Sequence, residues 1–146
     1  MGETKPTRAQ LFAKVTMKPD SETINFIQNT LVPYMRQAVQ TAEGNPKNHG
    51  VLSVPTKNAT EATQVLNNSI RNSYLRWIQS GKPGKFVDFM AARWAPVGAE
   101  NDPNNLNVNW PGNVRGALQQ QLGPEQYNRW KVLKLAQLPQ TNVGVA

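Results

Sequence analysis

The residues of this chain that could do chemistry are acidic side chains in two stretches. Glu43 stands directly before Gly44, and later in the chain Glu100 and Asp102 flank Asn101. Carboxylic acids serve proteins as general acids and bases, provided that their surroundings hold the right protonation state. The sequence therefore contains one candidate acid and, further on, two carboxylates that could assist it.

Glu43 is predicted to be the last residue of a helix, because Gly44 is a good left-handed terminator and Pro46 follows it. A carboxylate at this end faces the negative end of the helix dipole, which costs about 0.3–1 kcal/mol at an exposed position. The same field favours the protonated form that a general acid needs. The alternative is an ordinary surface glutamate that happens to precede a terminating glycine.

The composition fits one domain and excludes several kinds of site. The chain has 146 residues, enough for a sizeable core, with 4 Trp, 3 Tyr and 4 Phe to fill it. The absence of cysteine excludes disulfides and thiolate zinc sites. Because His49 is the single histidine, we expect no metal and no cofactor.

The formal net charge of +7 predicts an anionic partner or surface, such as nucleic acid, lipid headgroups or bacterial cell wall. The basic residues are scattered, which is typical of a solvated surface. The aromatic residues fall on predicted core stripes and do not alternate with Lys and Arg, so we do not expect a nucleic-acid-binding module. We expect no membrane span and no signal peptide, because no segment has the required apolar run.

Helical periodicity dominates the chain and must position both acidic stretches. The apolar stripes at helical spacing cover residues 24–42, 62–78, 86–94, 114–122 and 127–136. Pro33 lies inside the first stripe and predicts either a kink or two abutting helices. Gly81 should end the helix of the second stripe. Pro111 suits the first turn of a helix, and Gly123-Pro124 should interrupt the helical run and start the last helix.

The remaining segments are predicted to be irregular. Residues 51–54 could form a short strand or hairpin arm, and residues 99–109 are an Asn-rich loop. Pro19-Asp20-Ser21 should lead into a helix cap. The predicted fold is mainly α, a single helical domain with at most a short β-hairpin. Its expected parts are an N-terminal arm at 1–20, the helical domain at 21–138 and a C-terminal tail at 139–146.

The order of these motifs resembles that of phage and prophage lysozyme-like proteins, which include virion-associated members. The matching elements are Glu43-Gly44, Asn45-Pro46-Lys47-Asn48, the helix from Leu66 to Ile78, Arg93-Trp94-Ala95-Pro96 and Glu100-Asn101-Asp102. The resemblance implies a lysozyme-like fold and a muramidase or lytic transglycosylase that cleaves MurNAc–GlcNAc bonds of peptidoglycan. Two departures affect substrate binding: Asn45 follows Gly44 at once, and Lys47 replaces a glycine of the family pattern.

The resemblance also implies roles for the candidate residues. Glu43 would protonate the glycosidic oxygen as the single catalytic glutamate. The expected substrate-binding residues are Asn45, Asn48, Glu100, Asn101 and Asp102. A hydrolase needs a second carboxylate, whereas a lytic transglycosylase uses an attack by the substrate's own hydroxyl. Structural roles stay open: Asp102 could form an Asx turn, Glu100 could pair with Arg93, and Asp88 could simply be solvated.

The alternative function is a non-catalytic tail or baseplate protein of a virion, built on a degenerate lysozyme-like scaffold. Its partners would be other virion proteins, whereas the partner of the enzyme is peptidoglycan. The expected location is accordingly a phage virion or the periplasm and cell wall of the host.

Overall fold

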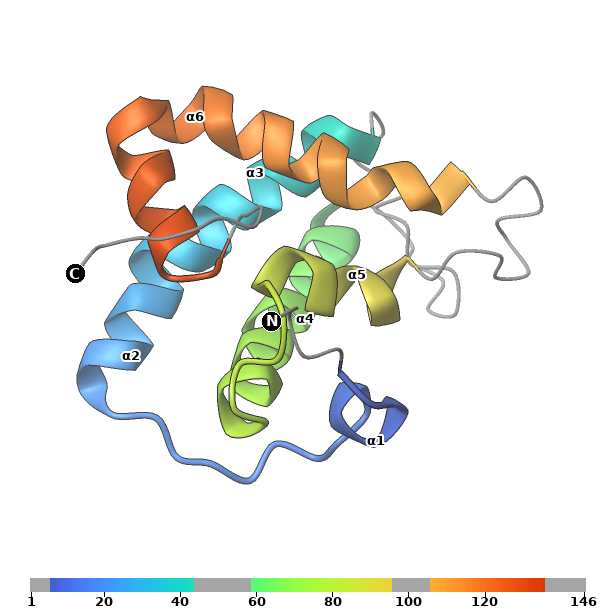
Figure 1. Ribbon diagram of the computed structural model, residues 1–146, viewed down its shortest axis with the longest axis vertical. Helices are drawn as coiled ribbons and strands as arrows, with labels where there is room; N and C mark the ends of the chain where they lie inside the picture. The colour runs from blue at the N-terminus through green and yellow to red at the C-terminus, as the bar shows by residue number, and fades with distance from the viewer. Residues whose placement is uncertain (1–5, 44–58, 96–105, 136–146) are drawn as a thin grey trace.

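The computed structural model describes residues 6–43, 59–95 and 106–135. All regular structure in these ranges is helical, which confirms the predicted mainly α character (Figure 1). The elements are α1 (Arg8–Leu11), α2 (Ser21–Phe26), the π-helical turn η1 (Ile27–Leu31), α3 (Val32–Glu43), α4 (Ala59–Gln79), α5 (Phe86–Trp94), the 3₁₀ turn η2 (Leu106–Asn109) and α6 (Trp110–Val132). The predicted hairpin at 51–54 lies outside the described residues.

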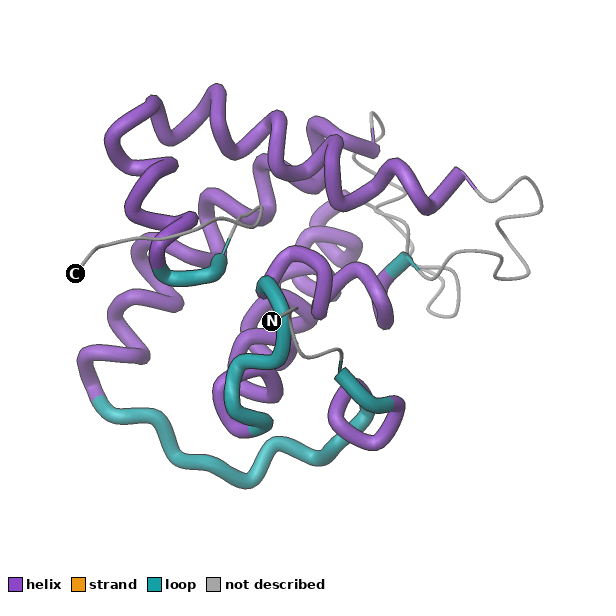
Figure 2. The backbone as a smooth tube through the Cα atoms, viewed as in Figure 1, coloured by secondary structure: helices purple, strands orange, loops and turns teal. Residues whose placement is uncertain are grey.

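The long helices surround one core. α6 crosses α3, α4 packs against α3, and α5 bridges α4 and α6 (Figure 1). The tube in Figure 2 shows one long stretch without regular structure among the described residues, between α1 and α2. This stretch belongs to the predicted N-terminal arm, and α1 brings its first part against α4 and α5.

The helical run around Pro33 is continuous, and a π turn absorbs the proline. Asp20 caps the start of the run, where its Oδ1 accepts a hydrogen bond from the Thr23 backbone N–H at 2.8 Å. Before the proline, the Val32 N–H donates to the Ile27 carbonyl five residues back, and not to the usual fourth. Proline lacks an N–H and crowds the carbonyl four residues before it, so one wider turn accommodates it within the helix. The predictions were a kink or two abutting helices, and the second is wrong, because the helical run continues without a gap from α2 through the π turn into α3.

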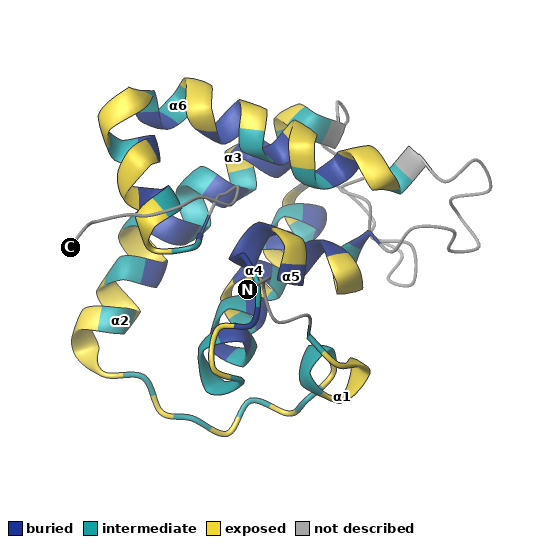
Figure 3. Cartoon of the chain, in the orientation of Figure 1, coloured by how far each residue is buried: buried dark blue, intermediate teal, exposed yellow. Residues whose placement is uncertain are grey.

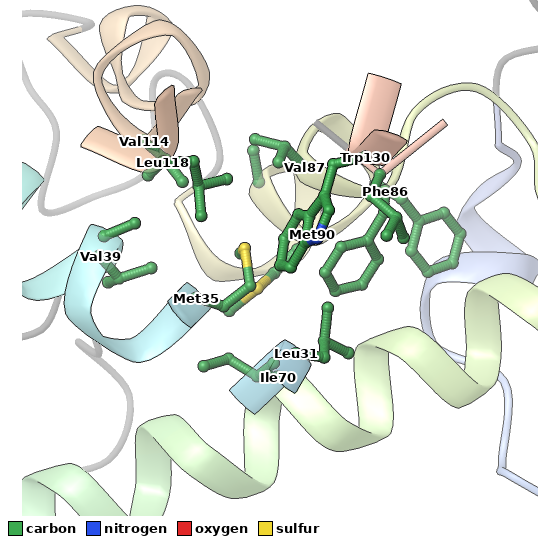
Figure 4. Close-up of a cluster of buried hydrophobic side chains, with 14 of the residues drawn as sticks. Leu31, Met35, Val39, Ile70, Phe86, Val87, Met90, Val114, Leu118 and Trp130 are labelled. Carbon is green, nitrogen blue, oxygen red and sulfur yellow. The ribbon is translucent and has the colours of Figure 1, made fainter. Parts of the chain in front are cut away.

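The apolar stripes meet in the core, as the buried inner faces in Figure 3 and the close-up in Figure 4 show. The converging side chains include Leu31, Met35, Val39, Ile70, Phe86, Val87, Met90, Val114, Leu118 and Trp130. Tyr74 adds aromatic contacts, with its ring centroid 5.8 Å from that of Phe26 and 5.6 Å from that of Phe86. Truncating such a buried side chain to alanine costs about 2–5 kcal/mol, so this convergence holds the helices in place.

The ends of α4 and α6 are built alike. At the end of α4, Gly81 has φ +88° and the Lys82 N–H donates to the Trp77 carbonyl at 2.7 Å. At the end of α6, Lys134 has φ +64° and the Leu135 N–H donates to the Trp130 carbonyl at 2.8 Å. Both arrangements are Schellman motifs, in which a left-handed residue lets the chain turn back on the helix. The sequence predicted the end of α4 from Gly81. It did not predict the end of α6, because the left-handed residue there is a lysine.

The end of α6 also caps α5. The carbonyls of Lys134 and Leu135 accept the backbone N–H groups of Phe86 and Val87 at 2.8 and 3.1 Å. These N–H groups lie in the first turn of a helix, where no carbonyl of the helix itself can reach them. The Lys134 ammonium Nζ donates to the Lys82 carbonyl at 2.8 Å. The ends of α4 and α6 and the start of α5 therefore form one hydrogen-bonded junction.

The structure tests the sequence expectations at three further places, namely Gly123, residues 106–109 and Leu133. Gly123 has φ +79° and ψ 166°, which confirms the predicted interruption before Pro124. The expected loop at 99–109 is wrong for its last four residues, which form η2 and lead directly into α6. Leu133 was expected on an apolar stripe, but it follows the last residue of α6 and is 51% exposed. Leu135, which follows the Schellman turn at Lys134, is buried instead.

Candidate functional site

The structure places the backbone of Glu43 at the end of α3, which is its predicted position. The preceding turns lie in the core, since Ala38 and Val39 are fully buried. α3 packs against both α4 and α6, and Arg36 Nη1 donates to Asn67 Oδ1 of α4 at 3.2 Å. The turns of α3 that precede Glu43 are therefore held by both neighbouring helices.

The other predicted site residues lie outside the described residues. They are Asn45 and Asn48, within residues 44–58, and Glu100, Asn101 and Asp102, within residues 96–105. His49 also falls in the first of these segments. Their proximity to Glu43 thus stays a prediction.

The helix ends that bracket these two segments lie on one side of the molecule (Figure 1). α3 ends and α4 begins there, and so do the end of α5 and the start of α6 with η2. The described helices that flank the two segments therefore end and begin on the side where α3 ends with Glu43.

The two tryptophans of α4 and α5 are core residues, as the sequence predicted. Trp77 is 1% exposed, and its Nε1 donates to the Pro83 carbonyl at 3.2 Å. Trp94 is partly buried and packs against the core, and its Nε1 is buried without a hydrogen-bond partner among the described residues. Trp77 therefore lacks the exposed face that a sugar-stacking platform needs.

Three other carboxylates of the described ranges have structural partners. Asp20 caps α2, and hydrogen bonds from the backbone and side chain of Thr23 lower its pKa below the ordinary value. Glu125 lies 3.9 Å from Arg129, one turn later on α6. Asp88 is exposed to solvent, as predicted, but it also has a partner, because its Oδ1 pairs with Arg115 Nη1 at 2.9 Å and joins α5 to α6.

Sequence reasoning missed a cluster of arginines around Phe12. The guanidinium carbons of Arg8 and Arg93 lie 4.7 and 5.0 Å from the centroid of the Phe12 ring. Arg76 Nε donates to the carbonyl of the next residue, Ala13, at 2.9 Å. The spacing of Arg8 and Phe12 on one helical turn is the single local signal of this cluster, and the other arginines join it through tertiary contacts. The predicted pairing of Arg93 with Glu100 falls outside the described residues.

Nothing matches this chain among protein-family models, curated proteins or solved structures.

Within the described ranges, no group of three His, Cys, Asp or Glu residues could hold a metal ion. No described helix is long and apolar enough to cross a membrane.

Proposed function

We propose that this chain is a phage-type peptidoglycan glycosidase on a lysozyme-like helical fold, with Glu43 as its general acid. The observation that carries the proposal is the position of Glu43 at the end of a core helix, on the side where α5 ends and α6 begins. A catalytic acid works best on an element whose own position is fixed by packing. α3 meets this requirement through its buried face and its contacts with α4 and α6.

The proposed chemistry begins with proton transfer from Glu43 to the oxygen of a MurNAc–GlcNAc bond. In a hydrolase, Glu100 or Asp102 would activate water or stabilise the positive charge that develops on the sugar. In a lytic transglycosylase, a hydroxyl of the substrate attacks the anomeric carbon, and Glu43 first donates and then accepts the proton. The amides of Asn45, Asn48 and Asn101 would bind sugar hydroxyls.

The positive net charge of the chain supports peptidoglycan of the bacterial cell wall as the substrate. The formal net charge is +7, and bacterial cell wall is an anionic polymer. Attraction over the whole surface raises the local concentration of such a substrate. This long-range effect weakens with added salt, because dissolved ions screen exposed charges.

The test is a zymogram on purified peptidoglycan, comparing the wild type with Glu43→Gln and Glu22→Gln. Glutamine keeps the shape of Glu43 but cannot donate the acidic proton, so clearing should disappear in that variant. Glu22 lies exposed in the first turn of α2 and serves as the matched control, which should clear like the wild type. An anhydro sugar end on the products identifies a transglycosylase, and a reducing end identifies a hydrolase.

A second candidate function is a non-catalytic structural protein of a phage virion. It is favoured by the adjacent exposed apolar residues Val132 and Leu133, which are 64% and 51% exposed at the end of α6. Such a pair suits a contact with another virion protein. Absence of clearing by the wild type, or clearing that Glu43→Gln leaves unchanged, would reject the enzyme and favour this candidate.

A further inference from the structure

Three arginines from different helices converge on one segment of the N-terminal arm. Arg8 of α1 and Arg93 of α5 both lie within 5.0 Å of the Phe12 ring centroid. Arg76 of α4 binds the Ala13 carbonyl with its Nε at 2.9 Å. The fold thus gathers three positive charges that are far apart in the sequence.

Among the described residues, no negative charge compensates this arrangement. In the described part of the chain, no carboxylate pairs with Arg8, Arg76 or Arg93. Arg76 Nη1 is buried and has no hydrogen-bond partner in the part of the chain that the structure describes. Burial and the charge of Arg93 both lower the pKa of Arg76. Like charges held this close repel one another, and an anion between them would relieve the repulsion.

The cluster is open to solvent on its outer side. Phe12 is 48% exposed, and both Arg8 and Arg93 are exposed residues. Arg76 is only partly accessible and lies against the arm. A ligand could therefore reach the guanidinium groups of Arg8 and Arg93 from solvent, and the charge of Arg76, which is near enough to interact with that of Arg93, adds to the attraction.

We propose that the cluster of Arg8, Arg76 and Arg93 at Phe12 is a binding site for a phosphate group. The guanidinium group presents several N–H donors in one plane, which matches the oxygens of phosphate. Phosphate also carries more negative charge than a carboxylate, so it compensates a cluster of three cations better. The cation–π contacts with Phe12 hold Arg8 and Arg93 in place before the ligand arrives.

The experiment measures thermal unfolding during a titration with inorganic phosphate, at constant ionic strength maintained with chloride. A ligand that binds the folded state raises the melting temperature as its concentration rises. The wild type should show this rise. Arg8→Gln and Arg93→Gln should each weaken phosphate binding by about tenfold, because each removes a charge-assisted hydrogen bond.

The matched control is Arg71→Gln, which removes one positive charge from the exposed side of α4 away from this cluster. It should keep the full response to phosphate. The proposal is overturned if the wild type shows no rise, or if Arg71→Gln and Arg93→Gln respond alike. In that case the arginines serve only to hold the arm.

Two further measurements keep the result interpretable. If circular dichroism shows that Arg93→Gln is unfolded, Arg93→Lys replaces it as the test variant. Lysine retains the charge over Phe12 but lacks the planar donor group, so this variant should still bind phosphate more weakly than the wild type.

Titration with a single-stranded DNA oligomer separates the two sources of the ligand, a phosphodiester and a free phosphate group. Binding that needs Arg93 and is displaced by inorganic phosphate assigns the site to a phosphodiester. Phosphate binding without such DNA binding assigns it to a free phosphate group.

Discussion

The side chain of Gln79 holds the N-terminal arm at the end of α4, where its Oε1 accepts the backbone N–H of Thr16 at 2.7 Å. The same oxygen accepts the Thr16 hydroxyl at 3.1 Å and the Met17 N–H at 3.0 Å. The Nε2 group donates to the Lys14 carbonyl at 2.9 Å. One amide therefore satisfies backbone groups of a segment that belongs to no helix or sheet.

Gln79→Ala removes all of these hydrogen bonds at once. We expect the free energy of unfolding to fall by about 1–3 kcal/mol, because the arm loses its partners while its ends still pack on the core. Urea denaturation measures this change. Hydrogen exchange should show faster exchange at the Thr16 and Met17 amides.

Gln64→Ala is the control for this prediction, since Gln64 is exposed on the same helix. Its effect should stay within about 0.5 kcal/mol. Equal protection of the arm amides in both variants would contradict the role of Gln79.

The elements that sequence reasoning placed correctly depend on local signals. The spacing of Leu31, Met35 and Val39 predicted one buried helix face, and all three side chains are fully buried. Gly81 predicted the end of α4, because a glycine tolerates the left-handed conformation found there. Lys134 adopts the same conformation without a glycine. Its strain is offset by the junction with α5, which no local pattern reveals.

The candidate site was also predictable only in part, because local sequence patterns do not reveal tertiary contacts. The position of Glu43 at a helix end follows from the residues next to it. Whether it meets Glu100 or Asp102 depends on how distant segments fold together, which spacing along the chain does not determine. The arginine cluster is an example of the same limit. Arg93 of α5 contacts Phe12, which directly follows α1, and the two residues are far apart in the sequence.

The cap at Asp20 gives the fold a specific dependence on pH. Hydrogen bonds from Thr23 lower the pKa of Asp20 below its ordinary value of 3.8. A carboxyl with a lowered pKa in the folded state stabilises the protein fully above its unfolded pKa. This contribution disappears as the pH falls through the folded pKa. The cap should therefore hold above pH 3.8 and weaken below it.

Asp20→Ser tests this dependence, because serine also caps helices but does not titrate. Melting temperatures of both proteins would be measured between about pH 5 and pH 2, the range in which such carboxyl groups titrate. The advantage of the wild type over the variant should shrink as the pH falls. A difference that is constant over this range would mean that the carboxylate makes no cap in solution.

Two glycines of α6 should respond in opposite ways to the same substitution. Gly123 has φ +79° and ψ 166°, a conformation that residues with a side chain strongly disfavour. Gly116 lies in the regular part of the helix, where alanine is the better residue. An added Cβ would meet no atom within 4 Å at either position. The two substitutions therefore isolate the backbone contribution from any steric clash.

Gly116→Ala should raise the free energy of unfolding by about 0.5–1 kcal/mol, because alanine loses less conformational entropy on folding. Gly123→Ala should lower it by about 1–3 kcal/mol, since the kink before Pro124 forces the new side chain into a strained conformation. Urea denaturation of both variants beside the wild type measures the two changes. If Gly123→Ala stabilised the protein as Gly116→Ala does, the helix would have to run straight through residue 123. The last turns of α6, which cap α5, would then need a different path.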